Sequence, residues 1–186
     1  MSVVVVRPGD SARLAEALTL LNRSLGEQIY SPEKLAEVTR DPEAMLTIWE
    51  DGGVQAAAVA RLLYPEDSSY YAAFGPTATA PFARSRVGSL EAVAVKEDQR
   101  HQGIGRQLTL DQMSWLARQG CEVVVAVSWL SGGSGTSAGM YRDLGFTGTS
   151  PVADFYLAES IRDGWACPSC HGPCHCSAAF FWRRLR

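Results

Sequence analysis

Residues 95–106 read Val-Lys-Glu-Asp-Gln-Arg-His-Gln-Gly-Ile-Gly-Arg, and they join an apolar, strand-like run at residues 90–95 to a helix-like run at residues 104–119. Glycines between a strand and a helix let an anion approach backbone N–H groups, because no Cβ is in the way. The helix N-terminus adds unpaired N–H groups and partial positive charge. Arg100, His101 and Arg106 flank the turn with further donors. The stretch therefore predicts a diphosphate site at a strand-to-helix turn.

Length and composition fit a small globular protein. The chain has 186 residues, a formal net charge of -3 and 46% hydrophobic residues, which suits one domain with a sizeable core, or one domain plus an appendage. Its mild acidity gives no support to a general nucleic-acid binder or an anionic-membrane binder. The opening apolar run, residues 3–6, is too short for a signal-peptide core, and no later run is long enough to span a bilayer. We expect a soluble, cytoplasmic protein.

Apolar periodicity and turn residues predict alternating strands and helices. Asp10 and Ser31 are expected N-caps, and Asp51-Gly52 is a hairpin turn signal. In chain order we expect a strand at 2–7, helices after residue 10 and at about 32–41, a hairpin at 44–63, a long loop that could hold a short helix at 64–87, a strand at 90–95, a helix at 104–119, a buried strand at 121–127, a short helix ending at 144–145, an extended run at 146–155, a helix at 156–163 and a last strand at 178–183. This order predicts a mixed α/β fold.

Four of the five cysteines lie within ten residues, as Cys167-Pro-Ser-Cys170 and Cys174-His-Cys176. Reducing conditions in the cytoplasm make metal ligands a better interpretation than a disulfide framework. Four thiolates with no open position predict a structural, closed, tetrahedral zinc site. His171 and His175 are spare ligands, and the alternative is a loop with free thiols. The fifth cysteine, Cys121, heads a buried strand and is interpreted as a core residue.

A second glycine-rich run, Gly133-Ser-Gly-Thr-Ser-Ala138 with Asp154 further on, suggests a dinucleotide fingerprint. The helix after it ends early, at Gly145, and only one fragment of a doubly wound fold is visible. The same loop has no lysine where a P-loop needs one. This motif is the weaker of the two anion-site candidates.

Two motifs together resemble those of the GCN5-related N-acetyltransferase (GNAT) superfamily. Val95, Arg100, Gly103 and Gly105 match its acyl-CoA motif, Val-x4-Arg/Gln-x-x-Gly-x-Gly/Ala, and the run Met-Tyr141-Arg-Asp-Leu-Gly-Phe resembles its Tyr-x-x-Leu-Gly-Phe signature. The resemblance covers roughly residues 2–158. It implies a single acetyltransferase domain over residues 1–186, with a mostly antiparallel sheet flanked by helices. The segment at 164–177 is an insert before the last strand that most family members lack.

The resemblance also implies how acetyl-CoA is held. The residues implied to grip its pyrophosphate are Arg100, His101, Gln102, Gly103, Ile104, Gly105 and Arg106. The backbone of Val93, Ala94 and Val95 would bind the pantetheine arm, and the N–H near Val93 would polarise the thioester carbonyl. Ser134 stands where the family often has asparagine, and its hydroxyl would still contact the cosubstrate.

The implied catalytic residues are Tyr141 and Glu91. Tyr141 matches a tyrosine near the CoA sulfur that serves as general acid, although a packing tyrosine is the alternative. Glu91 matches a position where some members place a general base. Strand alternation places Glu91, Val93 and Val95 on one face and Leu90, Ala92 and Ala94 on the other, so a carboxylate among valines is expected to have a raised pKa. A structural Glu91 paired with an arginine is the other interpretation.

We therefore predict an N-acetyltransferase that moves an acetyl group from acetyl-CoA to a primary amine by direct attack. The acceptor, a small-molecule or peptide amine, would enter between the first two helices, the 64–87 loop and residues 155–165. We expect no nucleic-acid or membrane partner, and the chain could form a homodimer. The alternative is a CoA-binding or zinc-mediated interaction module without transfer activity.

Overall fold

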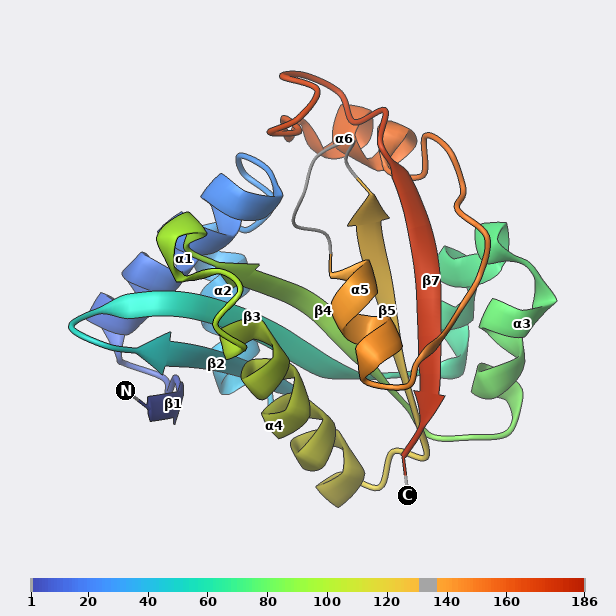
Figure 1. Ribbon diagram of the computed structural model, residues 1–186, viewed down its shortest axis with the longest axis horizontal. Coiled ribbons are helices and arrows are strands. Elements are labelled where there is room, and N and C mark those ends of the chain that lie inside the picture. The colour runs from blue at the N-terminus through green and yellow to red at the C-terminus, as the bar shows by residue number, and fades with distance from the viewer. Residues whose placement is uncertain (1, 131–136, 186) are drawn as a thin grey trace.

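A computed structural model describes residues 2–130 and 137–185 of the chain. Its seven strands form one sheet in the order β1-β2-β3-β4-β5-β7-β6 (Figure 1). The strands are β1 (Ser2–Val5), β2 (Ala44–Glu50), β3 (Val54–Leu63), β4 (Val87–Val95), β5 (Val123–Leu130), β6 (Thr147–Gly148) and β7 (Ser177–Arg184). Only β4 and β5 pair in parallel, so the predicted mixed, mostly antiparallel sheet is confirmed.

Helices lie on both faces of this sheet. They are α1 (Ser11–Leu25), α2 (Pro32–Arg40), α3 (Pro76–Thr79), α4 (Ile104–Arg118), α5 (Ala138–Asp143) and α6 (Leu157–Asp163), with 3-10 segments η1 (Pro65–Phe74), η2 (Ala80–Ala83) and η3 (Glu97–Gln99). Both predicted N-caps are confirmed. The Asp10 carboxylate accepts from the Arg13 N–H at 3.4 Å, and the Ser31 hydroxyl from the Lys34 N–H at 3.1 Å. Each cap satisfies an N–H that has no partner within its own helix.

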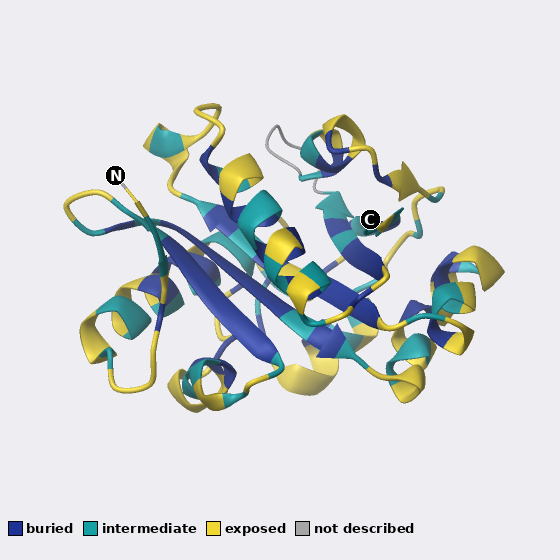
Figure 2. Cartoon of the chain, turned by 90° about the horizontal axis from the view of Figure 1, so that it is seen from below, coloured by how far each residue is buried: buried dark blue, intermediate teal, exposed yellow. Residues whose placement is uncertain are grey.

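The core consists of two layers, one on each side of the sheet. In β5, Val123 and Val125 pack with the 65–83 segment on one side, while Val124 and Ala126 pack with α4 and α5 on the other. The α1 and α2 helices cover the β2–β4 half of the first side. Figure 2 shows the strands buried between helices whose outer surfaces are exposed. Within the described residues, no helix is both long and apolar enough to cross a membrane.

A bulge in β4 overturns the alternation expected from the sequence. Val59 of β3 pairs with Ala92, but the next residue, Ala60, pairs with Leu90, so Glu91 is an extra residue in β4. Such an insertion shifts the side-chain alternation by one. The prediction that Leu90 shares a face with Ala92 is therefore wrong. Leu90 packs on the α4 side, whereas Ala92 packs in the core under α1 and α2.

Other differences from the expected elements are local. The 64–87 segment is not a plain loop, because η1, α3 and η2 occupy much of it, and β4 begins at Val87 rather than at residue 90. The extended run expected at 146–155 is reduced to β6 and one isolated bridge, Val152 with Ala178. The expected α6 and β7 are confirmed to within one residue at each end.

Gly88 shows how closely β4 packs against α4. A Cβ at Gly88 would lie 2.8 Å from Leu116 Cδ1, and Leu116 is fully buried and has no room to move. We predict that Gly88→Ala lowers the free energy of unfolding by roughly 1–3 kcal/mol through overpacking. Urea denaturation measures this change in the free energy of unfolding. Gly139→Ala in α5 is the control, since a Cβ there meets nothing within 4 Å; equal effects of the two substitutions would contradict the packing argument.

Candidate active site

The site begins where β4 and β5 separate. Their parallel pairing runs only from Val87 to Leu90 of β4. Beyond that point β4 continues to Val95 paired only with β3, and β5 continues to Leu130 paired only with β7. Figure 1 shows the two strands diverging. Because each strand keeps one unpaired edge facing the other, the backbone of residues 91–95 offers free N–H and C=O groups.

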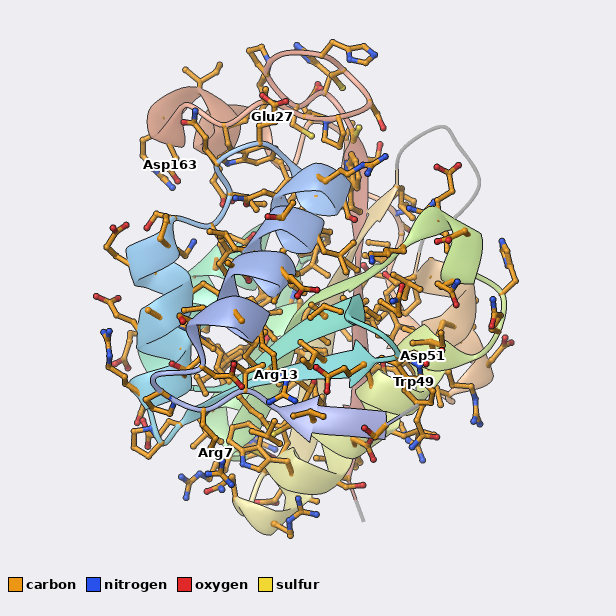
Figure 3. The ribbon with its side chains drawn as sticks, turned by 90° about the vertical axis from the view of Figure 1, so that its left-hand side faces the viewer. Arg7, Arg13, Glu27, Trp49, Asp51 and Asp163 are labelled. Carbon is orange, nitrogen blue, oxygen red and sulfur yellow. The ribbon has the colours of Figure 1, made fainter. Side chains whose placement is uncertain are left out.

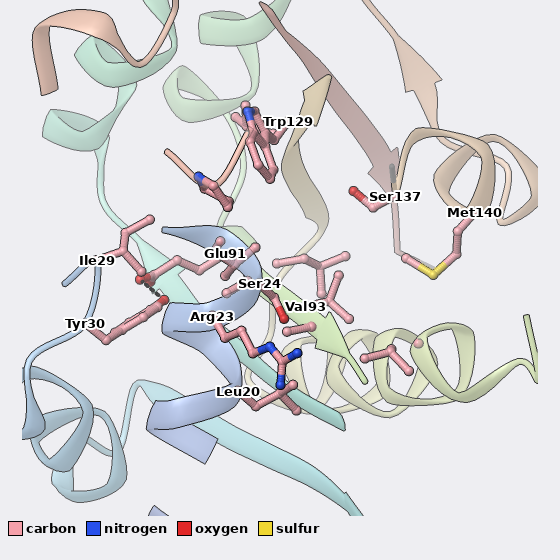
Figure 4. A pocket seen from close by; sticks show the side chains of 18 of the residues that line it. Leu20, Arg23, Ser24, Ile29, Tyr30, Glu91, Val93, Trp129, Ser137 and Met140 are labelled. Atoms are coloured by element: carbon pink, nitrogen blue, oxygen red, sulfur yellow. Dashed lines mark hydrogen bonds between the residues drawn. The ribbon is translucent and has the colours of Figure 1, made fainter. Parts of the chain in front are cut away.

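A cleft of about 1970 Å³ occupies this separation and extends over both neighbouring layers (Figure 4). One end, called here the glycine-turn end, is lined by residues 93–95, by most of residues 100–106 and by Met140 of α5. The other, called the aromatic end, is lined by Tyr30, Tyr70, Tyr71, Tyr156 and Trp165. A cleft of this size can hold two reactants.

The geometry of the glycine turn suits an anion. Gly103 has a φ of 81°, and a Cβ at that position would meet no atom within 4 Å, so the space beside its backbone is open. The N–H groups of the first turn of α4, which starts at Ile104, have no partners within the helix. A Cβ on Gly105 would lie 3.4 Å from Val95 and 3.8 Å from Met140, so the bare backbone of this glycine leaves space between β4 and α5.

The predicted turn residues do not all contribute in the same way. Arg100, His101, Gly103, Ile104, Gly105 and Arg106 line the cleft. Gln102 is absent from that lining, and its amide donates to the Asp98 carbonyl at 3.4 Å. Arg100 Nε donates to the Val95 carbonyl at 3.2 Å, which places its guanidinium beside the end of β4. Ser134 lies outside the described residues.

Tyr141 projects from α5 into the cleft and is only 3% exposed. Its ring packs against Phe146 and Phe181, with centroids 5.2 and 5.5 Å away. Burial raises the pKa of the Tyr141 phenol to about 12, and a hydrogen bond with Ser137 opposes that rise. The phenol therefore keeps its proton at neutral pH and is available as an acid. Ser137 was missed by the sequence reasoning, although it lies one helical turn before Tyr141.

Glu91 is held by two partners. Tyr30 donates its hydroxyl to Glu91 Oε1 at 2.9 Å, and Arg61 Nε lies 3.0 Å from Glu91 Oε2 (Figure 4). The prediction that valines surround Glu91 is wrong, because the bulge turns Glu91 away from Val93 and Val95 and toward the α1–α2 connection. Pairing with an arginine, the alternative drawn from the sequence, is what the structure shows. Burial, followed by the charge of Glu91, raises the pKa of Tyr30 well above its usual value.

The four clustered cysteines form a compact group of sulfurs. All four Sγ atoms of Cys167, Cys170, Cys174 and Cys176 lie within 4.8 Å of one another. Two of the distances are 3.8 Å, from Cys167 to Cys176, and 3.6 Å, from Cys170 to Cys176. A tetrahedron with metal–sulfur bonds of about 2.3 Å has edges of about 3.8 Å. The group therefore has the dimensions that a metal ion requires.

Backbone and indole N–H groups surround these sulfurs. The N–H of Cys170 donates to Cys167 Sγ and that of His175 to Cys170 Sγ, both at 3.4 Å. Burial raises the pKa of the Cys176 thiol to about 12, and the nearby Trp129 side chain opposes that rise. The Trp129 indole nitrogen is itself buried and has no well-aligned partner. A metal-bound thiolate would accept all of these donors, so the residues fit a metal.

The two spare histidines lie outside this group. His175 Nδ1 is 3.0 Å from an Asp154 carboxylate oxygen, and the four sulfurs come together without either His171 or His175. Asp154 was also part of the dinucleotide pattern, whose glycines lie outside the described residues. The single parallel strand pair in the described sheet does not fit the doubly wound fold which that pattern requires.

Comparison with known proteins gives the family. The model of the acetyltransferase (GNAT) family matches residues 13–146. The chain belongs to the GNAT acetyltransferase family. No curated protein matches the sequence at a significant level.

Several solved structures share the fold of this GNAT protein. NAA60 of Arabidopsis thaliana in complex with acetyl-CoA has a TM-score of 0.69 at 13% identity, over 99% of this chain and 98% of that chain. Naa20 of Chaetomium thermophilum with a bisubstrate analogue has a TM-score of 0.66 at 18% identity, over 100% and 87%. The polyamine N-acetyltransferase of Drosophila melanogaster, which forms N-acetylagmatine, has a TM-score of 0.62 at 16% identity, over 99% and 100%. At these identities the likeness shows the fold alone.

Proposed function

We propose that this GNAT protein transfers the acetyl group of acetyl-CoA to a primary amine by direct attack. The observation that carries the proposal is the unpaired edge of β4. It leads from the glycine turn at one end of the cleft, past Tyr141 of α5, toward the carboxylate of Glu91. A thioester arm lying along that edge, like an added strand, would bring its carbonyl between Tyr141 and Glu91.

The glycine-turn end would hold the CoA diphosphate. The free N–H groups at the start of α4 and the open space beside Gly103 would receive the phosphate oxygens, and Arg100 and Arg106 would add positive charge. The backbone of Val93, Ala94 and Val95 would bind the pantetheine amides. Since Gly105 has no side chain, the arm can pass between Val95 and Met140.

Three groups of the chain would serve the chemistry. The N–H near Val93 would stabilise the negative charge that develops on the carbonyl oxygen as the amine nitrogen attacks. Tyr141 would give its proton to the departing thiolate, which suits a phenol that stays protonated in a dry pocket. Glu91 would take the proton lost by the amine, directly or through a water, while Tyr30 and Arg61 hold its carboxylate in place.

The aromatic end would receive the acceptor amine. Amines are cations at neutral pH, and both aromatic faces and carboxylates attract cations. This end combines tyrosine and tryptophan rings with the carboxylates of Glu91, Asp67 and Glu159. Burial raises the pKa of Glu159, whose carboxylate lies 3.4 Å from the Tyr70 hydroxyl. We therefore propose a small-molecule or peptide amine that enters here.

We also propose that the four clustered cysteines bind one zinc ion in a closed, structural site. Four sulfur ligands leave no position for a substrate, and the transfer chemistry above uses only groups of the chain. The zinc would stabilise the segment between α6 and β7 rather than take part in the reaction.

An amine panel tests the activity. We expect turnover of acetyl-CoA with at least one small-molecule or peptide amine, and Tyr141→Phe should lower kcat by at least about 10²-fold, because the thiolate loses its acid. Acetyl-CoA affinity, measured by calorimetry, should stay unchanged in that variant. Acetyl-CoA binding without turnover on any amine would instead indicate a CoA-binding module.

Gly103 tests the diphosphate site. Gly103→Glu places a carboxylate where the phosphates would lie, and we expect acetyl-CoA affinity to fall at least about tenfold through like-charge repulsion. Gly103→Asn is the matched control, because asparagine tolerates a positive φ and adds no charge. Both variants should keep their fold by circular dichroism and their metal content. Equal affinities in the two variants would contradict this placement of the diphosphate.

Metal analysis tests the cysteine site. Purified protein should contain about one equivalent of zinc, and Cys174→Ser should lose most of it, since metal binding needs the full ligand set. Cys121→Ser is the control, because Cys121 lies two residues before β5, outside the group of four sulfurs. A content below about half an equivalent, unaffected by substitution of the clustered cysteines, would exclude the site.

A further inference from the structure

The cysteine segment, residues 164–177, is attached to both walls of the aromatic end. The Glu27 N–H, in the connection between α1 and α2, donates to the Ala166 carbonyl at 3.1 Å. Figure 3 shows Glu27 beside this segment. The Cys174 N–H donates to the buried Ser160 hydroxyl of α6 at 2.9 Å. The segment therefore links the α1–α2 connection to α6 across the end of the cleft where the acceptor would enter.

Trp165 belongs to both the sulfur group and the cleft. It is 6% exposed, packs with Cys167, Cys174 and Cys176, and lines the aromatic end. Its ring approaches α1 so closely that a Cβ on Gly26 would lie 3.0 Å from Trp165 Cε3. Its position therefore depends on the α1–α2 connection on one side and on the cysteines on the other.

Trp129 of β5 also contacts both the sulfur group and the cleft. Its ring packs against the sulfur group and also lines the cleft, above Glu91 and Val93 in the view of Figure 4. The indole nitrogen is buried and has no well-aligned partner, and the ring lies against the buried cluster that contains Cys176. The position of this ring therefore depends on the packing of the cysteine segment.

Little else in the described cysteine segment fixes its conformation. Between α6 and β7 it contains no helix or strand, only the isolated bridge of Cys167 with Gly172 and that of Ala166 with Glu27. Metal binding energy is folding energy when a site has no other framework. Metal loss would therefore free Trp165 and remove the packing partner of the Trp129 ring, whose backbone stays in β5. The glycine-turn end, built on β4 and α4, packs in a separate cluster and would be unaffected.

We propose that the metal held by these cysteines sets the affinity of the cleft for its acceptor amine, through Trp129 and Trp165, and leaves acetyl-CoA binding unchanged. This inference rests on the proposed acetyl transfer. The two tryptophans are positioning residues, and the metal takes no part in the chemistry.

The experiment compares zinc-loaded protein, the same protein after removal of zinc with a chelator, Cys170→Ser and the control Cys121→Ser. Four quantities are measured: zinc content, acetyl-CoA affinity, the KM and kcat for the best amine of the panel, and backbone hydrogen exchange. Metal loss should raise the amine KM about 10- to 100-fold, as expected when positioning groups move by about an ångström. Acetyl-CoA affinity should change less than about twofold, which is below 0.5 kcal/mol by the relation of affinity to free energy. Exchange should increase at residues 26–30 and 164–177 and stay unchanged in β4 and α4.

A second variant, Trp165→Leu, tests the contribution of the cleft wall separately from that of the metal. It should retain zinc and acetyl-CoA affinity and still raise the amine KM, because the ring is lost while the ligands remain. An unchanged KM after metal loss would overturn the inference and leave the transfer activity standing. The inference would also be overturned if metal loss increased hydrogen exchange throughout the chain and abolished acetyl-CoA binding. The metal would then stabilise the whole fold. If no amine is turned over, the proposed function fails. Separately, unchanged backbone hydrogen exchange at residues 26–30 after metal loss would overturn the link between the metal and the wall of the cleft.

Discussion

The separation of β4 from β5 is the constraint on which the site depends. Both strands are long enough to pair along their whole length, yet their ladder ends at Leu90. The extra residue, Glu91, bends and twists β4 at that point, as bulges do. One local irregularity therefore opens the cleft, exposes a strand edge and turns the Glu91 carboxylate toward Tyr30. A regular strand would have paired with β5 and closed the space.

The two ends of the cleft differ in the groups they present. The glycine-turn end has the first N–H groups of α4 with Arg100 and Arg106, and the aromatic end has tyrosine and tryptophan rings with Glu91 and Glu159. Tyr141 lies in a buried position where the neutral phenol is favoured. Glu91, in contrast, contacts an arginine and a tyrosine hydroxyl, which fix the position of its carboxylate. Burial thus governs the environment of Tyr141, whereas polar partners govern that of Glu91.

The cysteine segment extends this arrangement beyond the common fold. It lies in the chain between α6 and β7, and its contacts with α6 and with the α1–α2 connection place it over the aromatic end. Two of its sulfurs accept N–H donors from its own backbone, and Trp129 of β5 packs against the sulfur group. The same tryptophan therefore belongs to the sulfur group and to the wall of the cleft, which couples two features that the sequence shows as separate motifs.

Local signals in the sequence determined the helix caps, the hairpin, the order of elements, the glycine turn and the grouping of the four cysteines. Each depends on residues close together in the chain, where spacing alone fixes geometry. The bulge at Glu91 and the partners Tyr30 and Arg61 were decided only by the tertiary structure. A bulge depends on the register between two strands, and Tyr30 meets Glu91 across 61 residues of chain. For the same reason Trp129 and Trp165 could be recognised as aromatic residues from the sequence, but their shared contact with the sulfurs required the folded chain.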